Sequence, residues 1–112
     1  MTWDELQNRI DNFYLDNENK IKIPYSHYDF DREVEPPHLM STEIESNNFV
    51  ADNKIYYEKS NARLELTTDT RDRNLEKRIE QEIFYDVIWQ KEITYIQTEG
   101  VWNVSYFFEI IV

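Results

Sequence analysis

The stretch Ala62-Arg63-Leu64-Glu65-Leu66-Thr67 decides the fold, because apolar and polar side chains alternate along it. Successive side chains of a β-strand point to opposite faces of a sheet, so this pattern predicts a strand with one apolar and one wetted face. It lies within residues 55–68, the longest strand signal in the chain. The apolar face needs a cover, and amphipathic helices are the usual cover for one face of such a sheet.

The same alternation returns at the end of the chain. Residues 91–98 and 101–112 read as two strands joined by a turn at Glu99-Gly100. In the second of them, the side chains that share one face are Trp102, Val104, Tyr106, Phe108, Ile110 and Val112. This closing hairpin therefore contributes a second apolar face to the same core.

Two weaker strand signals precede the central one. Residues 21–25 alternate, and Pro24 predicts that this strand lies at a sheet edge or ends early, because proline donates no ladder hydrogen bond. Residues 39–44 also alternate, and the charged segment 29–37 between the two reads as a surface loop.

Two segments have helical periodicity. Residues 2–16 predict a helix whose buried face carries Trp3, Leu6, Ile10 and Phe13, with Thr2 and Glu5 placed for a capping box. A second helix follows the possible N-caps in residues 69–72, with Leu75, Ile79 and Ile83 on one face and the period continuing towards Val87. The predicted fold is α+β, two helices packed on one face of a mainly antiparallel sheet, in one domain over residues 1–112.

Composition excludes several classes of function. The 112 residues include one glycine and no cysteine, which rules out glycine-rich phosphate cradles, disulfide frameworks, cysteine–zinc sites and thiol catalysis. The formal charge is −11, from 23 Asp and Glu against 12 Lys and Arg. This charge argues against a protein that binds nucleic acid through its phosphates, because such binding needs an excess of Lys and Arg. No apolar run is long enough to span a bilayer and no signal-peptide pattern is present, so we expect a soluble protein made in a cytoplasm, with no membrane partner.

No motif in the chain assigns catalytic chemistry. The segment His27-Tyr28-Asp29-Phe30-Asp31 could offer metal ligands at alternate positions, but an EF-hand starting at Asp29 would meet Val34 and Met40 where it needs glycine and glutamate. A solvated acidic loop is the better interpretation. We therefore expect no catalytic residue, no cofactor and no metal, and a protein that is not an enzyme.

Two segments are candidates for an interface. The turn-rich segment 46–53 contains Phe49 and Val50 between Asn48 and Asp52, and hydrophobic residues in a loop need cover either from the chain's own core or from another subunit. A basic cluster, Arg71, Arg73, Lys77 and Arg78, could contact an acidic neighbour or passing DNA. Its alternative is a solvated helix face with the pairs Arg73–Glu76, Lys77–Glu80 and Arg78–Glu82. The candidate interface residues are Asn48, Phe49, Val50, Asp52, Arg71 and Arg73.

From Pro36-Pro37 onward the chain carries a series of stretches in a characteristic order and spacing. They are Ser46-Asn47-Asn48-Phe49, Ala51-Asp52, Tyr56, Leu64-Glu65-Leu66, Thr68-Asp69, Leu75-Glu76, Ile79-Glu80, Lys91, Tyr95-Ile96, Glu99-Gly100, Tyr106 and Glu109. In this pattern the chain resembles the tail completion or tail terminator proteins of long non-contractile-tailed phages and prophages of Gram-positive bacteria.

This resemblance implies a structural assembly protein made in the bacterial cytoplasm and located at the head–tail junction of the virion. Such proteins form rings, often hexameric, that cap the tail tube and join it to the head. The implied partners are further copies of the chain, the tail-tube protein and the head connector protein, with DNA only passing through the lumen. Two alternatives stay open, a head-side connector of adaptor or stopper type and an acidic inhibitor that mimics DNA.

Overall fold

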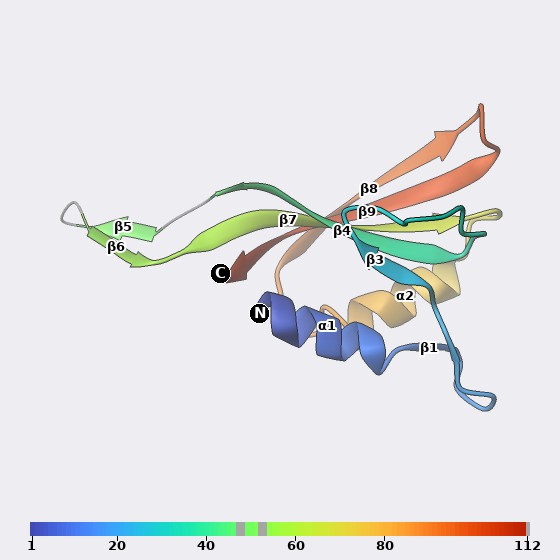
Figure 1. Ribbon diagram of the computed structural model, residues 1–112, viewed down its shortest axis with the longest axis horizontal. Helices are drawn as coiled ribbons and strands as arrows, with labels where there is room; N and C mark the ends of the chain where they lie inside the picture. The colour runs from blue at the N-terminus through green and yellow to red at the C-terminus, as the bar shows by residue number, and fades with distance from the viewer. Residues whose placement is uncertain (47–48, 52–53, 112) are drawn as a thin grey trace.

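The computed structural model describes residues 1–46, 49–51 and 54–111, and of residues 49–51 and 54–57 it describes the backbone. Figure 1 shows a twisted sheet with both helices against one of its faces and a narrow two-stranded arm reaching away from them. The predicted α+β class with a mainly antiparallel sheet is confirmed.

The main sheet has the strand order β3-β4-β7-β9-β8. The strands are β3 (Tyr25–His27), β4 (His38–Ser46), β7 (Lys59–Thr68), β8 (Trp89–Ile96) and β9 (Val101–Ile111). Every neighbouring pair is antiparallel except β3 and β4, which are parallel. Strand β7 lies between β4 and β9 and so has a hydrogen-bonding partner on both edges. The strand expected over residues 21–25 is divided before Pro24, which can donate no ladder hydrogen bond. Residues 21–22 belong to a separate two-stranded ribbon, and β3, which begins after Pro24, is an edge strand of the main sheet.

The alternation on β7 puts its apolar side chains into the core. Ala62, Leu64 and Leu66 are buried and lie opposite Phe108, Tyr106 and Val104 of β9. Arg63 and Glu65 lie on the other face, where their side chains form an ion pair at 3.3 Å. The helices α1 (Trp3–Asp11) and α2 (Arg73–Glu82) cover the apolar face through Leu6, Ile10, Leu75 and Ile79.

Helix α1 begins as predicted but ends earlier. The Thr2 hydroxyl accepts a hydrogen bond from the Glu5 backbone N–H at 3.2 Å, and the helix ends at Asp11 rather than Asp16. The periodic signal at Phe13 misled the prediction, because Phe13 is buried after the chain has left the helix. The next residues form the short ribbon of β1 (Tyr14–Asp16) and β2 (Ile21–Lys22).

Helix α2 also stops short of its apolar period. The Asp72 carboxylate caps it by accepting from the Leu75 N–H at 3.0 Å, and the last helical residue is Glu82. Ile83 and Phe84 are both buried, although neighbouring helical residues point about 100° apart, because here the chain turns into the core. The expected continuation towards Val87 is therefore wrong.

The segment predicted as the loop 46–53 contains a strand. Strand β5 (Phe49–Ala51) pairs antiparallel with β6 (Lys54–Tyr57) in a separate two-stranded sheet. The long strand expected over residues 55–68 is therefore divided, with Glu58 between β6 and β7. The division arises because β6 pairs with β5, while β7 pairs with β4 and β9.

Candidate functional site

The part of the fold that stands apart from the core is the hairpin arm, which we define as strands β5 and β6 with the adjoining ends of β4 and β7. Strands β4 and β7 pair from His38↔Thr67 as far as Ser46↔Ser60, and β5 and β6 continue the hairpin beyond that point. In Figure 1, β5 and β6 lie well away from both helices. The sheet thus presents a two-stranded ribbon to the surroundings.

A groove of about 1090 Å³ lies at the base of the hairpin arm. It is formed by segments far apart in the sequence: the first residue, the base of the arm, the turn before β8 and the end of β9. Its apolar lining includes Met1, Ile44, Ile88, Trp89, Phe107 and Ile111. We call this site the basal groove. A concave and mainly apolar surface of this kind is a candidate binding site.

Three substantially exposed isoleucines come together in the basal groove. Ile88 is 92% exposed, Ile44 is 50% exposed and Ile111 is 42% exposed. All three are among the groove's lining residues, whereas Ile21 lies elsewhere, on the β1–β2 ribbon. Burying a fully exposed side chain of this size releases roughly 1.5–3 kcal/mol, so a partner would gain most of that at Ile88 and about half of it at Ile44 and at Ile111.

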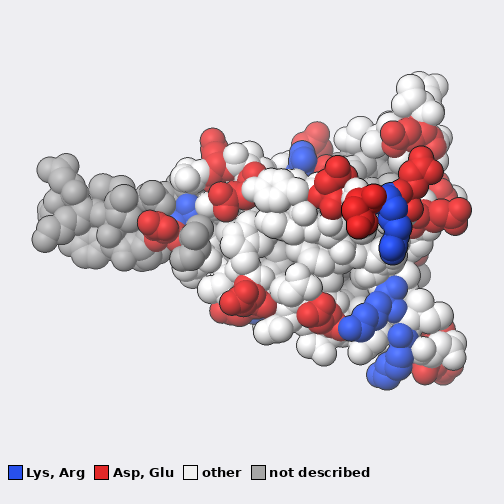
Figure 2. Space-filling model, viewed as in Figure 1, with Lys and Arg blue, Asp and Glu red and all other residues white. Residues whose placement is uncertain are grey.

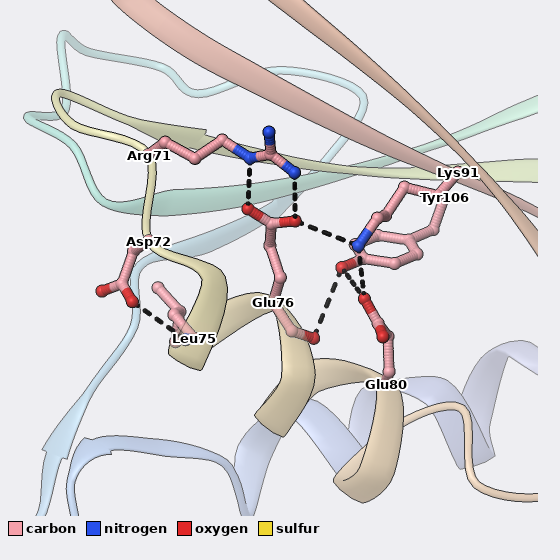
Figure 3. Close-up of polar contacts among 7 residues, drawn as sticks. All are labelled: Arg71, Asp72, Leu75, Glu76, Glu80, Lys91 and Tyr106. Atoms are coloured by element: carbon pink, nitrogen blue, oxygen red, sulfur yellow. Dashed lines mark hydrogen bonds and ion pairs between the residues drawn. The ribbon is translucent and has the colours of Figure 1, made fainter.

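A buried charge cluster fixes the position of α2 on the sheet (Figure 3). The Glu76 carboxylate, whose side chain is 2% exposed, accepts from Arg71 Nε at 2.9 Å and from Lys91 Nζ at 3.0 Å. Lys91 also bonds Glu80 at 2.9 Å, and the Tyr106 hydroxyl donates to the same carboxylate at 2.8 Å. One lysine from β8 therefore neutralises two carboxylates one helical turn apart, which would otherwise repel each other.

The pKa values in this cluster follow from these contacts. Burial alone would raise the pKa of Glu76, but the hydrogen bonds from Arg71 and Lys91 outweigh it and hold that pKa below its ordinary value. Burial, and then the hydrogen bond to Glu80, raise the pKa of the Tyr106 hydroxyl far above its ordinary value. The cluster is therefore charged at Glu76 and Lys91 and neutral at Tyr106 around pH 7.

A second polar cluster joins β3 to β4. Ser41 Oγ lies 2.8 Å from His27 Nδ1 and 2.6 Å from the Tyr25 hydroxyl. A serine beside a histidine is the start of a nucleophilic site, but Ser41 has no exposed surface, so no substrate can reach its oxygen. The cluster instead ties the short edge strand β3, through Tyr25 and His27, to Ser41 of β4.

The structure places the predicted interface residues at two separate ends of β7. Phe49 and Val50 lie on β5 of the hairpin arm, and their side chains lie outside what is described, as do Asn48 and Asp52 entirely. Arg71 and Arg73 lie beyond the other end of β7, where α2 begins. The ten residues of β7 put roughly 30 Å between the two groups, so they do not form one site.

Within the basic cluster, the predicted ion pairs are only partly correct. Arg78 bonds Glu82 at 3.0 Å, as expected. The pairs Arg73–Glu76 and Lys77–Glu80 are not formed, because the two glutamates turn inward to Arg71 and Lys91. Arg73 is exposed at the start of α2 and makes no ion pair with any of the described residues. Arg71 is thus a structural residue, and Arg73 is the one that faces solvent.

The basal groove escaped the sequence reasoning because its residues are scattered. Ile44, Ile88 and Ile111 belong to three different elements, and each one alone reads as an ordinary strand or turn residue. Two signals were available in the sequence. Ile44 falls in the same alternation as Met40 and Thr42, on the side of the strand that was expected to face solvent. Ile88 follows the second helix but does not fit the spacing of its buried residues.

The comparisons with known proteins leave the family open. No protein-family model matches the chain, and no curated protein sequence is significantly similar to it. Among the residues described, neither helix has the length and apolar character needed to cross a membrane.

Proposed function

We propose that this chain is a structural assembly protein of phage or prophage tails, of the tail completion or tail terminator type. It would form a ring that caps the tail tube and joins it to the head, and its partners would be further copies of itself, the tail-tube protein and the head connector protein. The proposal starts from the ordered series of stretches between Pro36 and Glu109 that resembles that family.

The observation that carries the proposal furthest is the hairpin arm. A ribbon that leaves the core of its own chain is suited to contact a neighbouring subunit, and it holds two of the predicted interface residues, Phe49 and Val50. A ring needs one surface of the chain to fit a different surface of the next copy. The hairpin arm and the basal groove are two such different surfaces on one chain.

The charge distribution supports an assembly role over mimicry of DNA. Figure 2 shows acidic side chains spread over the visible face, with fewer basic side chains among them. Several carboxylates are already neutralised in ion pairs: Glu5, Glu65, Glu76, Glu80, Glu82, Asp86 and Glu109. A DNA mimic would need free carboxylates at regular phosphate-like spacing. A net negative ring, by contrast, would let DNA pass without holding it.

The test is to delete the gene in an inducible phage or prophage and to examine the particles by electron microscopy. We expect tails of uncontrolled length that do not join heads, and restoration of normal particles by the wild-type gene. Tails of normal length that still join heads would rule out the proposed function. A monomeric chain that blocks a DNA-binding enzyme would favour the inhibitor instead.

A further inference from the structure

We infer that the basal groove receives the hairpin arm of a second copy of this chain. The inference rests on the proposed function, because it names the two surfaces through which the proposed ring would form. It is carried by the geometry of the groove, the course of the arm and the charge of the groove.

The groove offers a docking surface for an apolar partner. Its volume of about 1090 Å³ and its lining by Ile44, Ile88 and Ile111, all substantially exposed, leave room for several large side chains. Trp89 and Phe107 extend the same lining. The surface that would be covered is therefore both concave and apolar, which is the form of a site that holds an aromatic or aliphatic anchor.

The hairpin arm has the sequence of such an anchor. Strands β5 and β6 contain Phe49, Val50, Ile55, Tyr56 and Tyr57 within a short ribbon. A two-stranded ribbon standing by itself is marginally stable in water, and aromatic residues are enriched where proteins meet. A partner that covered the ribbon would stabilise it, and the groove is the apolar surface of matching kind on this chain.

The chain's own arm does not fill its own groove. Ile44 and Lys59 line the groove and belong to the base of the arm, and β5 begins only five positions after Ile44. To enter its own groove the ribbon would have to fold back through a half turn over those few residues, against the β4–β7 pairing that continues to Ser46↔Ser60. In Figure 1 it instead runs outward. The occupant therefore comes from another copy.

The charges of the groove favour a protein ribbon over nucleic acid. Its lining includes Glu45, Asp86 and Glu109, and its Lys59 is already paired with Glu109 at 2.9 Å, so the described side chains of the lining offer a polyanion no unpaired cation. An arm from one copy in the groove of the next is a contact between two different surfaces, and such contacts close into a ring when the rotation between copies allows it.

Because the chain has no cysteine, single introduced cysteines can test this contact directly. One preparation carries Ile88→Cys in the groove, and two others carry Ile55→Cys or Tyr56→Cys in the arm. Adjacent residues of a strand point to opposite faces, so one of the two arm variants faces the groove if the arm is bound there. Each arm variant is mixed with the groove variant under mild oxidation, and mass spectrometry identifies the disulfide-linked chains.

We expect a disulfide between Ile88→Cys and one of the two arm variants in at least tenfold excess over the same arm variant mixed with Ile21→Cys. Ile21 is a matched control, because it is an isoleucine of similar exposure (51%) on the β1–β2 ribbon. Mixtures are followed up to about 1 mM chain, where a contact of only about −4 kcal/mol is half-formed. The absence of such an excess at every concentration overturns the inference. A chain that carries both Ile88→Cys and the arm cysteine is a second check, and a disulfide that forms only within that one chain also overturns the inference.

A second measurement separates this inference from the proposed function. In sedimentation analysis Ile88→Asp should weaken self-association at least tenfold, whereas Ile21→Asp should leave it unchanged. Rings that form without an arm-to-groove disulfide would overturn the inference and leave the tail-capping proposal standing. The disulfide together with normal tails in the deletion strain would overturn the proposed function and leave the contact between copies established.

Discussion

At the residue scale, Glu76 is the most consequential side chain outside the apolar core. Its side chain is 2% exposed, and its charge is met by Arg71 before α2 and Lys91 on β8. Removing one partner of a buried ion pair leaves an uncompensated charge, which is far more destabilising than removing a surface charge. The two cations thus determine where α2 lies on the sheet.

The first prediction concerns Glu76→Gln, which leaves Arg71 and Lys91 facing a neutral amide. We expect the free energy of unfolding to fall by about 2–3 kcal/mol, measured by urea denaturation. Glu92→Gln is the matched control, because Glu92 is exposed on the same strand as Lys91 and should change stability by no more than about 0.5 kcal/mol. Equal losses for the two variants would contradict a structural role for the cluster.

The second prediction is the pH dependence of that difference. Since hydrogen bonds hold the pKa of Glu76 below its ordinary value of 4.5 in the folded chain, its contribution is complete above pH 4.5 and is lost as the pH falls through the lower folded value. The stability gap between wild type and Glu76→Gln should therefore be constant near neutrality and shrink below pH 4.5.

The difference between the two proteins is measured because other carboxylates also titrate. Hydrogen bonds from Asn19 lower the pKa of Asp16, and the hydrogen bond from Arg9 lowers that of Asp86. Both carboxylates are present in wild type and variant, so their contributions cancel. A gap that persists undiminished at the lowest pH where both proteins still fold would count against this explanation.

At the element scale, α2 depends on how it starts. Asp72 satisfies the Leu75 N–H at 3.0 Å, and its negative charge lies at the positive end of the helix dipole. The last turn of the helix has no basic residue of its own, and its C-cap carbonyl at Ile83 instead accepts a hydrogen bond from Arg9 of α1 at 2.9 Å. Leu75 and Ile79 then carry the buried face into the core.

The third prediction follows from this cap. Asp72→Ala should lower the free energy of unfolding by about 1 kcal/mol, because the Leu75 N–H loses its acceptor. Asp69→Ala, an exposed aspartate three residues earlier, provides the control and should be close to neutral. If both substitutions had the same effect in thermal unfolding, general charge rather than capping would explain it.

At the scale of the whole molecule, the chain divides into a packed body and a projecting ribbon. The described core on the central hairpin is made by Leu39 of β4 and by Ala62, Leu64 and Leu66 of β7, all on the body side of the arm. The body therefore has what it needs to fold without β5 and β6.

The fourth prediction tests this division. Replacing residues 47–58 by Asn-Gly leaves a three-residue connection, Asn-Gly-Lys59, between the paired Ser46 and Ser60, which is a common length for a β-hairpin loop. We expect the free energy of unfolding to stay within about 1 kcal/mol of wild type, whereas self-association in sedimentation analysis is lost. A shortened chain that fails to fold would place the arm in the core, and one that still assembles would place the interface elsewhere.

The periodic patterns in the sequence were enough to locate the strands and helices but not to locate their ends. Ala62, Leu64 and Leu66 indicated the buried face of β7, and Leu75 with Ile79 indicated that of α2, because these patterns depend only on the geometry of one strand or helix. Phe13 and Ile83 extended the predicted helices too far. A buried residue just beyond the end of a helix can continue the three- to four-residue spacing of the helix. The spacing alone therefore does not show where the helix ends.

The sequence by itself determined the α+β class, the cap of the first helix at Thr2 and the apolar faces that form the core, and it narrowed the cap of the second helix to residues 69–72. The tertiary structure decided which charges meet and where a partner could bind. Glu76 is met by Lys91 because β8 is brought beside α2, and Ile44, Ile88 and Ile111 line one groove because the strand order places three distant segments together. Contacts of this kind depend on the packing of separate elements, which no local pattern encodes.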